Sequence, residues 1–256
     1  MNYTLLRRGD NLPSVGVLQK LLNRTGARLT VDGVFGPHTE AAVQAFQRTR
    51  RLSVDGIVGQ ETWPRLAAGA GLKILDCIDV FDPSLFELEA ADIAKVGGGA
   101  ILIGGECNGV EDAVNQIALR SGRDLFLLRF HGHGAPGTAG VSFGQGGVGF
   151  GERADIDTQN FEIMRPLLAR LRTIFGAYGN LQFMHCSTGS GPKGRSLLQN
   201  IAATVGVPVT AALQTQYGGG TATFKYEGPT FTALPGGGTL NTWCRLLPDF
   251  AGMSVA

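Results

Sequence analysis

The feature that most constrains the fold is a pair of apolar segments, each of which runs into a glycine-rich turn. The first is Phe126-Leu-Leu-Arg-Phe-His-Gly-His-Gly134, and the second is Leu181-Gln-Phe-Met-His-Cys-Ser-Thr-Gly-Ser-Gly191. Apolar runs bounded by turn formers indicate buried strands. Because open α/β sheets carry their functional groups at the carboxyl ends of the strands, the sequence predicts a histidine and a thiol at two parallel strand ends.

The segments around these two strands alternate between strand-like and helical patterns. The further strands are expected over residues 73–81, 99–104 and 207–213. The helices are expected over residues 84–95, 110–121, 158–176 and 194–205, and a glycine-rich hairpin region containing residues 221–226 follows. Regular alternation of this kind predicts an α/β fold with a mostly parallel sheet and helices on both faces. Residues 72–256 are therefore expected to form one α/β domain.

Residues 1–68 show a different, helical pattern with an internal repeat. Apolar residues recur at helical spacing over residues 15–22, with Ser14 as the expected amino-terminal cap, and again over residues 39–46. The turn Val31-Asp-Gly-Val-Phe-Gly36 returns as Val54-Asp-Gly-Ile-Val-Gly59, and Asp-Gly permits the positive φ of a tight turn. We predict a repeated three-helix module, joined to the α/β domain by small residues.

This repeated pattern resembles the peptidoglycan-binding domain found at the ends of many cell-wall hydrolases. The resemblance rests on four stretches, namely Leu6–Asp10, Val17–Asn23, Asp32–Gln47 and Asp55–Trp63. It implies a non-catalytic module that concentrates an attached enzyme on peptidoglycan, although some relatives of the module bind proteins instead. Its large aromatic residues are expected in the core rather than at the ligand: Phe35, Phe46 and Trp63.

The second domain resembles the caspase-like cysteine peptidases, in which an apolar block followed by His-Gly precedes a second apolar block that ends at the catalytic cysteine. The resemblance implies Cys186 as the nucleophile and His133 as the base that takes its proton. Exposed backbone amides around Gly134 or Cys186 are expected to stabilise the oxyanion. The Gly-His-Gly setting favours His133 over His131, which is expected to be a supporting partner or an alternative base. A caspase-type Gln-Ala-Cys-Arg-Gly segment is absent.

Three further residues are candidates for contacts with the substrate. Asp157, together with Asp155, lies between the two motifs and is either a substrate-facing acid or a cap of the following helix. Gln214 and Tyr217 follow the strand that comes after the cysteine motif, and we expect them to line the pocket. His185 is expected on the face opposite Cys186 if the strand continues, since side chains alternate.

Composition narrows the class of partner. The 22 Lys and Arg residues balance 21 Asp and Glu residues, so bulk charge points to neither nucleic acid nor acidic lipid. No run reaches the roughly 18 apolar residues of a membrane span. The amino terminus lacks the pattern of a secretory signal, so we expect synthesis in the cytoplasm and delivery to the periplasm or wall by a phage-type or effector-type route.

The cysteines and histidines show no metal-type spacing, and no cofactor is predicted. A metal site made from His131, His133 and His185 would have no evident carboxylate helper. The other cysteines follow strand-like runs or lie near the carboxyl terminus, and a disulfide among them stays open: Cys77, Cys107 and Cys244.

Together the two halves predict a cell-wall-targeted cysteine hydrolase that cleaves an amide bond in a peptidoglycan stem peptide or a wall-associated protein. The amino-terminal module would supply the contact with peptidoglycan, and a Cys-His pair would supply the chemistry. Two alternatives belong to other classes, namely a catalytically inert caspase-like binding module and a metal-dependent amidase. An inhibitor or immunity protein as a partner is left open.

Overall fold

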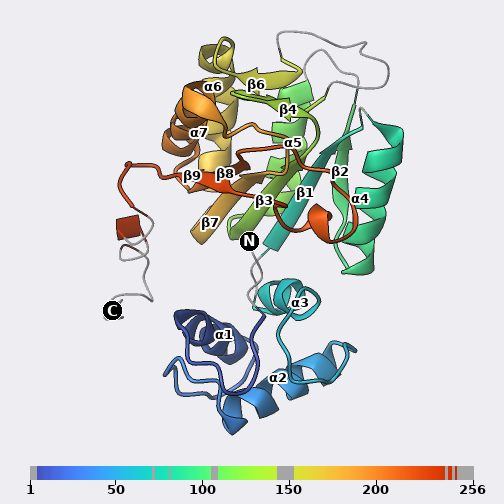
Figure 1. Cartoon of the computed structure of the whole chain (residues 1–256), viewed down its shortest axis with the longest axis vertical. Coiled ribbons are helices and arrows are strands. Elements are labelled where there is room, and N and C mark those ends of the chain that lie inside the picture. The colour runs from blue at the N-terminus through green and yellow to red at the C-terminus, as the bar shows by residue number, and fades with distance from the viewer. Residues whose placement is uncertain are drawn as a thin grey trace. The chain divides into compact units, whose positions relative to one another are not determined.

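The computed structural model describes residues 5–70, 73–80, 82–104, 109–142, 153–239, 242, 243 and 246 (Figure 1). The chain divides into two compact units, Met1–Ile74 and Leu75–Ala256, and each is described by itself. In the described part of the chain, no helix combines the length and the apolar character that a membrane crossing requires. Cys107, Cys244 and residues 143–152 lie outside the described residues.

The first unit contains the three predicted helices, α1 (Pro13–Arg24), α2 (Pro37–Thr49) and α3 (Thr62–Gly69). Of the three aromatic residues expected in its core, Phe35 in the first turn and Phe46 on α2 are buried. The third, Trp63 on α3, is half-buried. The prediction that Ser14 caps α1 is wrong. Leu12 occupies the cap position and Pro13 begins the helix, because the fixed φ of proline suits the first turn, where no amide donor is needed.

A buried glutamine holds the first Asp-Gly turn in place. The side-chain oxygen of Gln19 accepts hydrogen bonds from the amides of Asp32 (3.1 Å) and Gly33 (3.0 Å). Its Nε2 atom donates to Asp32 Oδ1 (2.7 Å) and to Thr39 Oγ1 (3.1 Å). One side chain on α1 therefore satisfies the polar groups of the turn and ties the turn to the start of α2.

The same arrangement recurs one helix later, which explains the repeat seen in the sequence. Gln47 on α2 accepts a hydrogen bond from the amide of Gly56 (3.0 Å). Its Nε2 atom donates to Asp55 Oδ1 (2.8 Å) and to Thr62 Oγ1 (3.3 Å) at the start of α3. The repeated Asp-Gly turns are thus structural elements, each fixed by a glutamine from the preceding helix.

The second unit is built around a six-stranded sheet with the order β2-β1-β3-β7-β8-β9. Its strands are β1 (Lys73–Asp79), β2 (Ala100–Ile103), β3 (Leu125–His131), β7 (Phe175–Phe183), β8 (Val209–Ala212) and β9 (Thr230–Ala233). The pairs β1–β2, β3–β7 and β7–β8 are parallel, and β9 pairs antiparallel with β8. A small antiparallel sheet contains β4 (Gly134–Ala135), β5 (Thr138–Gly140) and β6 (Asp155–Asp157).

The helices α4 (Pro83–Lys95), α5 (Gly109–Ser121), α6 (Phe161–Ala169) and α7 (Gly191–Val205) connect these strands. The chain moves in one direction along the sheet from β1 to β2 and in the other direction from β2 through β3 and β7 to β8. Because parallel crossovers are right-handed, α4 covers one face and α5, α6 and α7 cover the other. The predicted α/β class, with a mostly parallel sheet, is confirmed (Figure 1).

The helix predicted over residues 158–176 is shorter in the structure. α6 ends at Ala169, a 3-10 turn η2 (Arg170–Thr173) follows, and Phe175 already begins β7. Phe175 continues the helical spacing of apolar residues, but it pairs with Leu125 in the sheet. Pairing with a neighbouring strand therefore overrides the local helical pattern.

The predicted hairpin region containing residues 221–226 differs in detail. Residues Gly220–Thr223 form a 3-10 turn, η3, and the antiparallel partner of β8 is the later strand β9. Asp92 on α4 fixes η3, because its Oδ2 atom accepts hydrogen bonds from the Gly220 amide (2.7 Å) and the Thr223 hydroxyl (3.1 Å). This long-range contact could not be read from the local sequence.

Candidate active site

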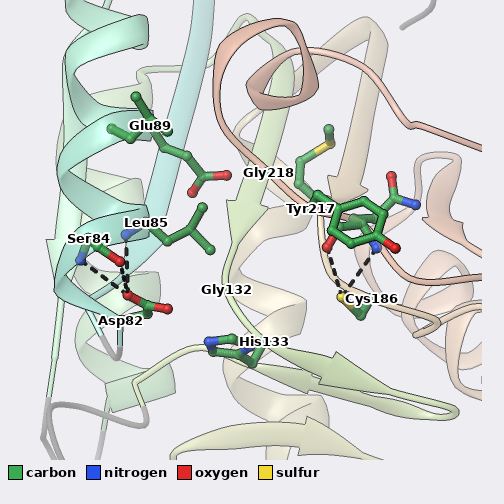
Figure 2. Close-up of a pocket in the computed structure, with 12 residues that line it drawn as sticks. Asp82, Ser84, Leu85, Glu89, Gly132, His133, Cys186, Tyr217 and Gly218 are labelled. Atoms are coloured by element: carbon green, nitrogen blue, oxygen red, sulfur yellow. Dashed lines mark hydrogen bonds between the residues drawn. The ribbon is translucent and has the colours of Figure 1, made fainter.

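A cavity of about 430 Å³ lies where β3 and β7 end, between α4 and the loop that follows β8 (Figure 2). Cys186 and His133 both line it. The carboxyl ends of parallel strands are the usual site of chemistry in this class of fold. Ten further residues complete the lining: Asp82, Ser84, Leu85, Leu88, Glu89, Gly132, Met184, Gln216, Tyr217 and Gly218.

Cys186 is placed by a sharp turn just beyond β7. The strand pairing ends near Met184, whose amide donates to Phe130 O (2.8 Å). Ser187 then takes a left-handed conformation (φ 53°), which is uncommon for a residue with a side chain. The half-buried Cys186 thiol donates to the carbonyl oxygen of Gln216 (3.2 Å), and the Gln216 amide donates to the sulphur (3.3 Å). Strand end and turn together direct the thiol into the cavity.

The loop that carries His133 is fixed to the loop that follows Cys186. The carbonyl of His133 accepts a hydrogen bond from the Gly140 amide (2.9 Å). Thr188 joins the two loops, since its hydroxyl donates to Thr138 O (2.7 Å) and its carbonyl accepts from the Gly137 amide (3.1 Å). The histidine and the cysteine therefore stand on segments that hold each other.

Gly134 lies where these two segments approach most closely. A Cβ atom at this position would lie 2.4 Å from Thr188 Oγ1, 2.7 Å from His185 Cβ and 2.9 Å from Cys186 O. Real Cβ atoms do not approach other atoms so closely, so only glycine fits here. The position that we expect to supply an oxyanion amide thus lies directly against the backbone of Cys186.

Asp82 lies at the amino end of α4, on the other side of His133 from Cys186 in the view of Figure 2. Its Oδ1 atom accepts hydrogen bonds from the Ser84 hydroxyl (2.7 Å) and amide (3.1 Å) and from the Leu85 amide (3.3 Å). These bonds lower the pKa of Asp82, and His133 contributes to the lowering. Asp82 is therefore both the helix cap and an ionised wall of the cavity.

His131, two residues earlier, belongs to a buried charge cluster behind the cavity. Its Nε2 atom lies 3.0 Å from Asp76 Oδ1, and its Nδ1 atom lies 3.5 Å from Glu89 Oε1. Arg129 binds both oxygens of Asp76, at 2.5 Å and 3.0 Å. Burial opposes the charge of His131, but the contacts with Asp76 and Glu89 raise its pKa above the ordinary value. For Asp76, burial is likewise outweighed, and Arg129 and His131 lower the pKa.

His185 is a buried neutral ring beside this cluster. Burial lowers its pKa to about 3, and the nearby charges of His131 and His133 act in the same direction. Its ring lies against the ring of Phe183, with centroids 5.5 Å apart. Neither ring nitrogen makes a hydrogen bond of regular geometry in the described part of the chain, and the nearby backbone of His131 offsets the lowering only in part. The chain thus places three histidines around the site in three different environments.

The structure brings three of the predicted site residues to one cavity, namely Cys186, His133 and Tyr217, whose side chain is 81% exposed. Gln214 is not among the lining residues, and its side chain lies against Gly228. Asp157 is also elsewhere, because its Oδ1 atom accepts hydrogen bonds from two amides at the start of α6. Among the described residues, no group of three or more His, Cys, Asp or Glu side chains could hold a metal ion.

Sequence reasoning did not identify Asp82, Glu89 and Gln216 as lining residues. Asp82-Pro83 is a recognisable helix start, but the face that a helix turns toward a site depends on the crossover that carries it. A usable signal was the presence of single charges inside apolar strands. Asp76 and Arg129 interrupt β1 and β3, and such buried charges need partners.

Cys77, for which a disulfide was left open, is a buried free thiol, and burial raises its pKa.

Comparison with known proteins identifies the first unit. The family described as "Putative peptidoglycan binding domain" matches residues 11–66. The zinc D-Ala-D-Ala carboxypeptidase of Streptomyces albus G is 52% identical over 42 residues, which are 16% of this chain and 16% of that protein. The chain therefore spans about a sixth of that curated relative.

Two solved structures are similar over part of the chain. The SleB N-terminal domain is 35% identical, with 27% of this chain and 94% of that chain covered and a TM-score of 0.26. The Burkholderia AP3 phage endolysin is 31% identical, with 47% of this chain and 39% of that chain covered and a TM-score of 0.26. On the family match, residues 11–66 of this chain belong to the peptidoglycan-binding domain family.

Proposed function

We propose that the protein is a cell-wall-targeted cysteine hydrolase of caspase-like type, with Cys186 as nucleophile and His133 as general base. The observation that carries the proposal is that these two residues line one cavity at the ends of the paired strands β7 and β3. The substrate bond is an amide in a peptidoglycan stem peptide or in a wall-associated protein. The placement of the two residues agrees with the resemblance of their motifs to the caspase-like peptidases.

The proposed reaction follows from the groups present. His133 takes the proton of the Cys186 thiol, and the thiolate forms a bond with the carbonyl carbon of the substrate. Backbone amides at Gly134 and Cys186 stabilise the oxyanion that develops on the carbonyl oxygen. The C–N bond then breaks, and the leaving amine takes the proton from His133. Water, deprotonated by His133, forms a bond with the carbonyl carbon of the thioester, the C–S bond breaks to release the acid product, and the proton on His133 returns to the Cys186 thiolate.

The amino-terminal unit would attach the enzyme to peptidoglycan. Membership of residues 11–66 in the peptidoglycan-binding family supports contact with the wall. A binding module attached to an enzyme raises the local concentration of substrate without any new contact at the active site. The site of action is therefore the periplasm or cell wall.

The test compares the wild type with Cys186→Ala and His133→Ala on purified peptidoglycan and, in parallel, on casein, with released fragments identified by mass spectrometry. Both variants are expected to lose at least about 10³-fold in rate, because each removes one member of a coupled pair. Cys77→Ala is the matched control, since this buried cysteine lies outside the cavity lining.

Other outcomes separate the alternatives. Full activity of Cys186→Ala, together with loss of wild-type activity in a chelator, would assign the reaction to a metal-dependent amidase. Absence of cleavage by the wild type, with Cys186 resistant to alkylation at neutral pH, would assign the second unit to an inert binding module.

A further inference from the structure

The lining of the cavity contains acidic residues but no lysine or arginine. Asp82 and Glu89 are the acidic residues among the twelve lining residues. Both carboxylates come from α4, one at its cap and one two turns later. A ligand group that enters this cavity therefore meets two carboxylates in the same cavity as Cys186.

Glu89 is the deeper of the two carboxylates. Its side chain is 5% exposed, and Figure 2 shows it projecting from α4 toward the cavity, above Leu85. Its Oε1 atom is the oxygen that faces His131 Nδ1, at 3.5 Å. With Oε1 directed at His131, a ligand in the cavity would bind Glu89 mainly through Oε2. A single oxygen suits a point charge such as an ammonium group, whereas a guanidinium fork binds best to both oxygens of a carboxylate.

The charged groups in and behind the cavity are mostly acidic. Asp76 and Glu89 face Arg129 and His131, and Asp79, which is also buried, lies beside the lining residue Gly132. Asp82 adds a further carboxylate at the lining, with His133 near enough to favour its ionised form. Acidic side chains thus outnumber lysine and arginine here, and a ligand with a positive charge suits such surroundings.

The remaining walls suit an aliphatic chain. Leu85, Leu88 and Met184 line the cavity with apolar surface, and the exposed ring of Tyr217 stands at its edge. Methylene groups can pack along such walls while a terminal amine reaches the carboxylates, as long cationic side chains commonly do. An aromatic face beside the amine adds a favourable cation–π contact.

We propose that the cavity selects a substrate residue with an ammonium-bearing aliphatic side chain, such as the diamino residue of a peptidoglycan stem peptide, and that Glu89 determines this specificity. The residue selected is the one whose carbonyl Cys186 attacks, because the same cavity contains the thiol and the carboxylates. This assignment rests on the proposed function for its catalytic consequence, but occupancy of the cavity can be measured without catalysis.

The first experiment measures ligand binding in the cavity by the protection of Cys186 from alkylation. The full chain is alkylated with iodoacetamide, and the Cys186 peptide is followed by mass spectrometry in the presence of N-acetyl-lysine amide, N-acetyl-arginine amide or N-acetyl-norleucine amide. The lysine compound is expected to protect Cys186 at a concentration about tenfold lower than the other two. Equal protection by lysine and norleucine compounds, or none by either, overturns the proposal whatever the enzyme hydrolyses.

Two variants and one matched control locate the effect. Glu89→Gln is expected to abolish the difference between lysine and norleucine compounds, because it removes the charge and keeps the shape. Asp82→Asn, which keeps a good helix cap, is expected to reduce the difference. Glu87→Gln makes the same change at an exposed position of α4 outside the cavity lining, and the lysine preference should persist. Persistence of the full preference in Glu89→Gln contradicts the role of that residue.

The second experiment links selection to turnover. Fluorogenic peptides with lysine, ornithine, arginine, norleucine or glutamate before the scissile amide are compared by kcat/KM. Lysine and ornithine are expected to exceed norleucine and arginine by about tenfold or more. Hydrolysis that depends on Cys186 without this preference would refute the inference and keep the proposed function. Lysine-selective protection without any hydrolysis would keep the inference as a binding site and refute the proposed function.

Discussion

The backbone of Gln216 contacts the sulphur of Cys186 twice, as a donor through its amide at 3.3 Å and as an acceptor through its carbonyl at 3.2 Å. The amide favours the thiolate, because a donor to the charged form stabilises that form, and the carbonyl favours the thiol. The loop after β8 is therefore part of the environment of the Cys186 thiol, although Gln216 lies 30 residues further along the chain.

The first prediction tests the amide of Gln216. Gln216→Pro removes the N–H donor, and we expect the rate of Cys186 alkylation at neutral pH to fall about tenfold, the equivalent of one hydrogen bond to a charged group. Gln216→Ala keeps the amide and should stay within about threefold of the wild type. An unchanged rate in the proline variant, with an unchanged circular dichroism spectrum, would show that the amide does not stabilise the thiolate.

The second prediction concerns the contact at Gly134. An added Cβ would overlap the backbone and side chains around Cys186, so Gly134→Ala should move the loop and reduce hydrolysis by at least about tenfold. The expected cost in folding free energy is about 1–3 kcal/mol, as for other overpacked sites. Gly236→Ala is the control, because its Cβ would meet nothing within 4 Å. Equal activity of both variants would show that the loops have room at Gly134.

The sequence predicted the strand ends well because each is a local pattern. An apolar run followed by glycines is contained within about ten residues, and β3 and β7 do pair as parallel neighbours. Gly134 and the two Asp-Gly turns follow from the same kind of local signal. The confirmed parts of the fold are therefore those whose determinants lie close together along the chain.

The parts that could not be predicted depend on distant partners. Phe175 has the spacing of a helical residue, yet its pairing with Leu125 makes it a strand residue. Glu89 reads as an exposed helical acid, and its burial follows from the packing of α4 beside His131 and Gly218. Local propensity carries no information about which face of α4 meets the loop after β8.

The third prediction uses the low pKa of His185. In the folded state the His185 ring binds a second proton only near pH 3. In the unfolded chain the same ring binds this proton near pH 6.5. The unfolded state therefore binds more protons between these values, and the stability of the wild type falls as pH falls from about 6.5 to about 3.

His185→Phe should remove this dependence, because phenylalanine does not titrate and can still pack against Phe183. The difference in unfolding free energy between variant and wild type is expected to grow in favour of the variant by on the order of 1 kcal/mol per pH unit below about pH 6.5. Urea titrations at pH 7.5, 6, 5 and 4, chosen as about evenly spaced points on this slope, measure it. A constant difference across the series would contradict the buried neutral state of His185.

The fourth prediction concerns the buried pair Asp76–Arg129. Asp76→Leu leaves Arg129 and His131 without their shared carboxylate, and we expect a loss of about 3–5 kcal/mol in unfolding free energy. The double variant Asp76→Leu with Arg129→Met removes both charges and should lose less than the sum of the two single losses. Additive losses, measured by urea unfolding, would show that the two residues act independently.

The last prediction concerns the glutamines that hold the Asp-Gly turns of the first unit. Gln47→Leu removes the bonds to Asp55, Gly56 and Thr62 and leaves polar groups of the turn without partners, so the unit should lose about 2–4 kcal/mol of stability. Hydrogen exchange at the Gly56 amide should accelerate with it. Gln60→Leu, at an exposed position beside α3, is the control.

Gln19 makes the equivalent bonds to the first turn, so Gln19→Leu should cost a similar amount of folding free energy. Retention of the Gln19 and Gln47 variants on peptidoglycan should fall in proportion to the fraction of unfolded protein. Wild-type exchange at Gly56 in Gln47→Leu would mean that the turn forms without its glutamine, and the repeated sequence motif would then need another explanation.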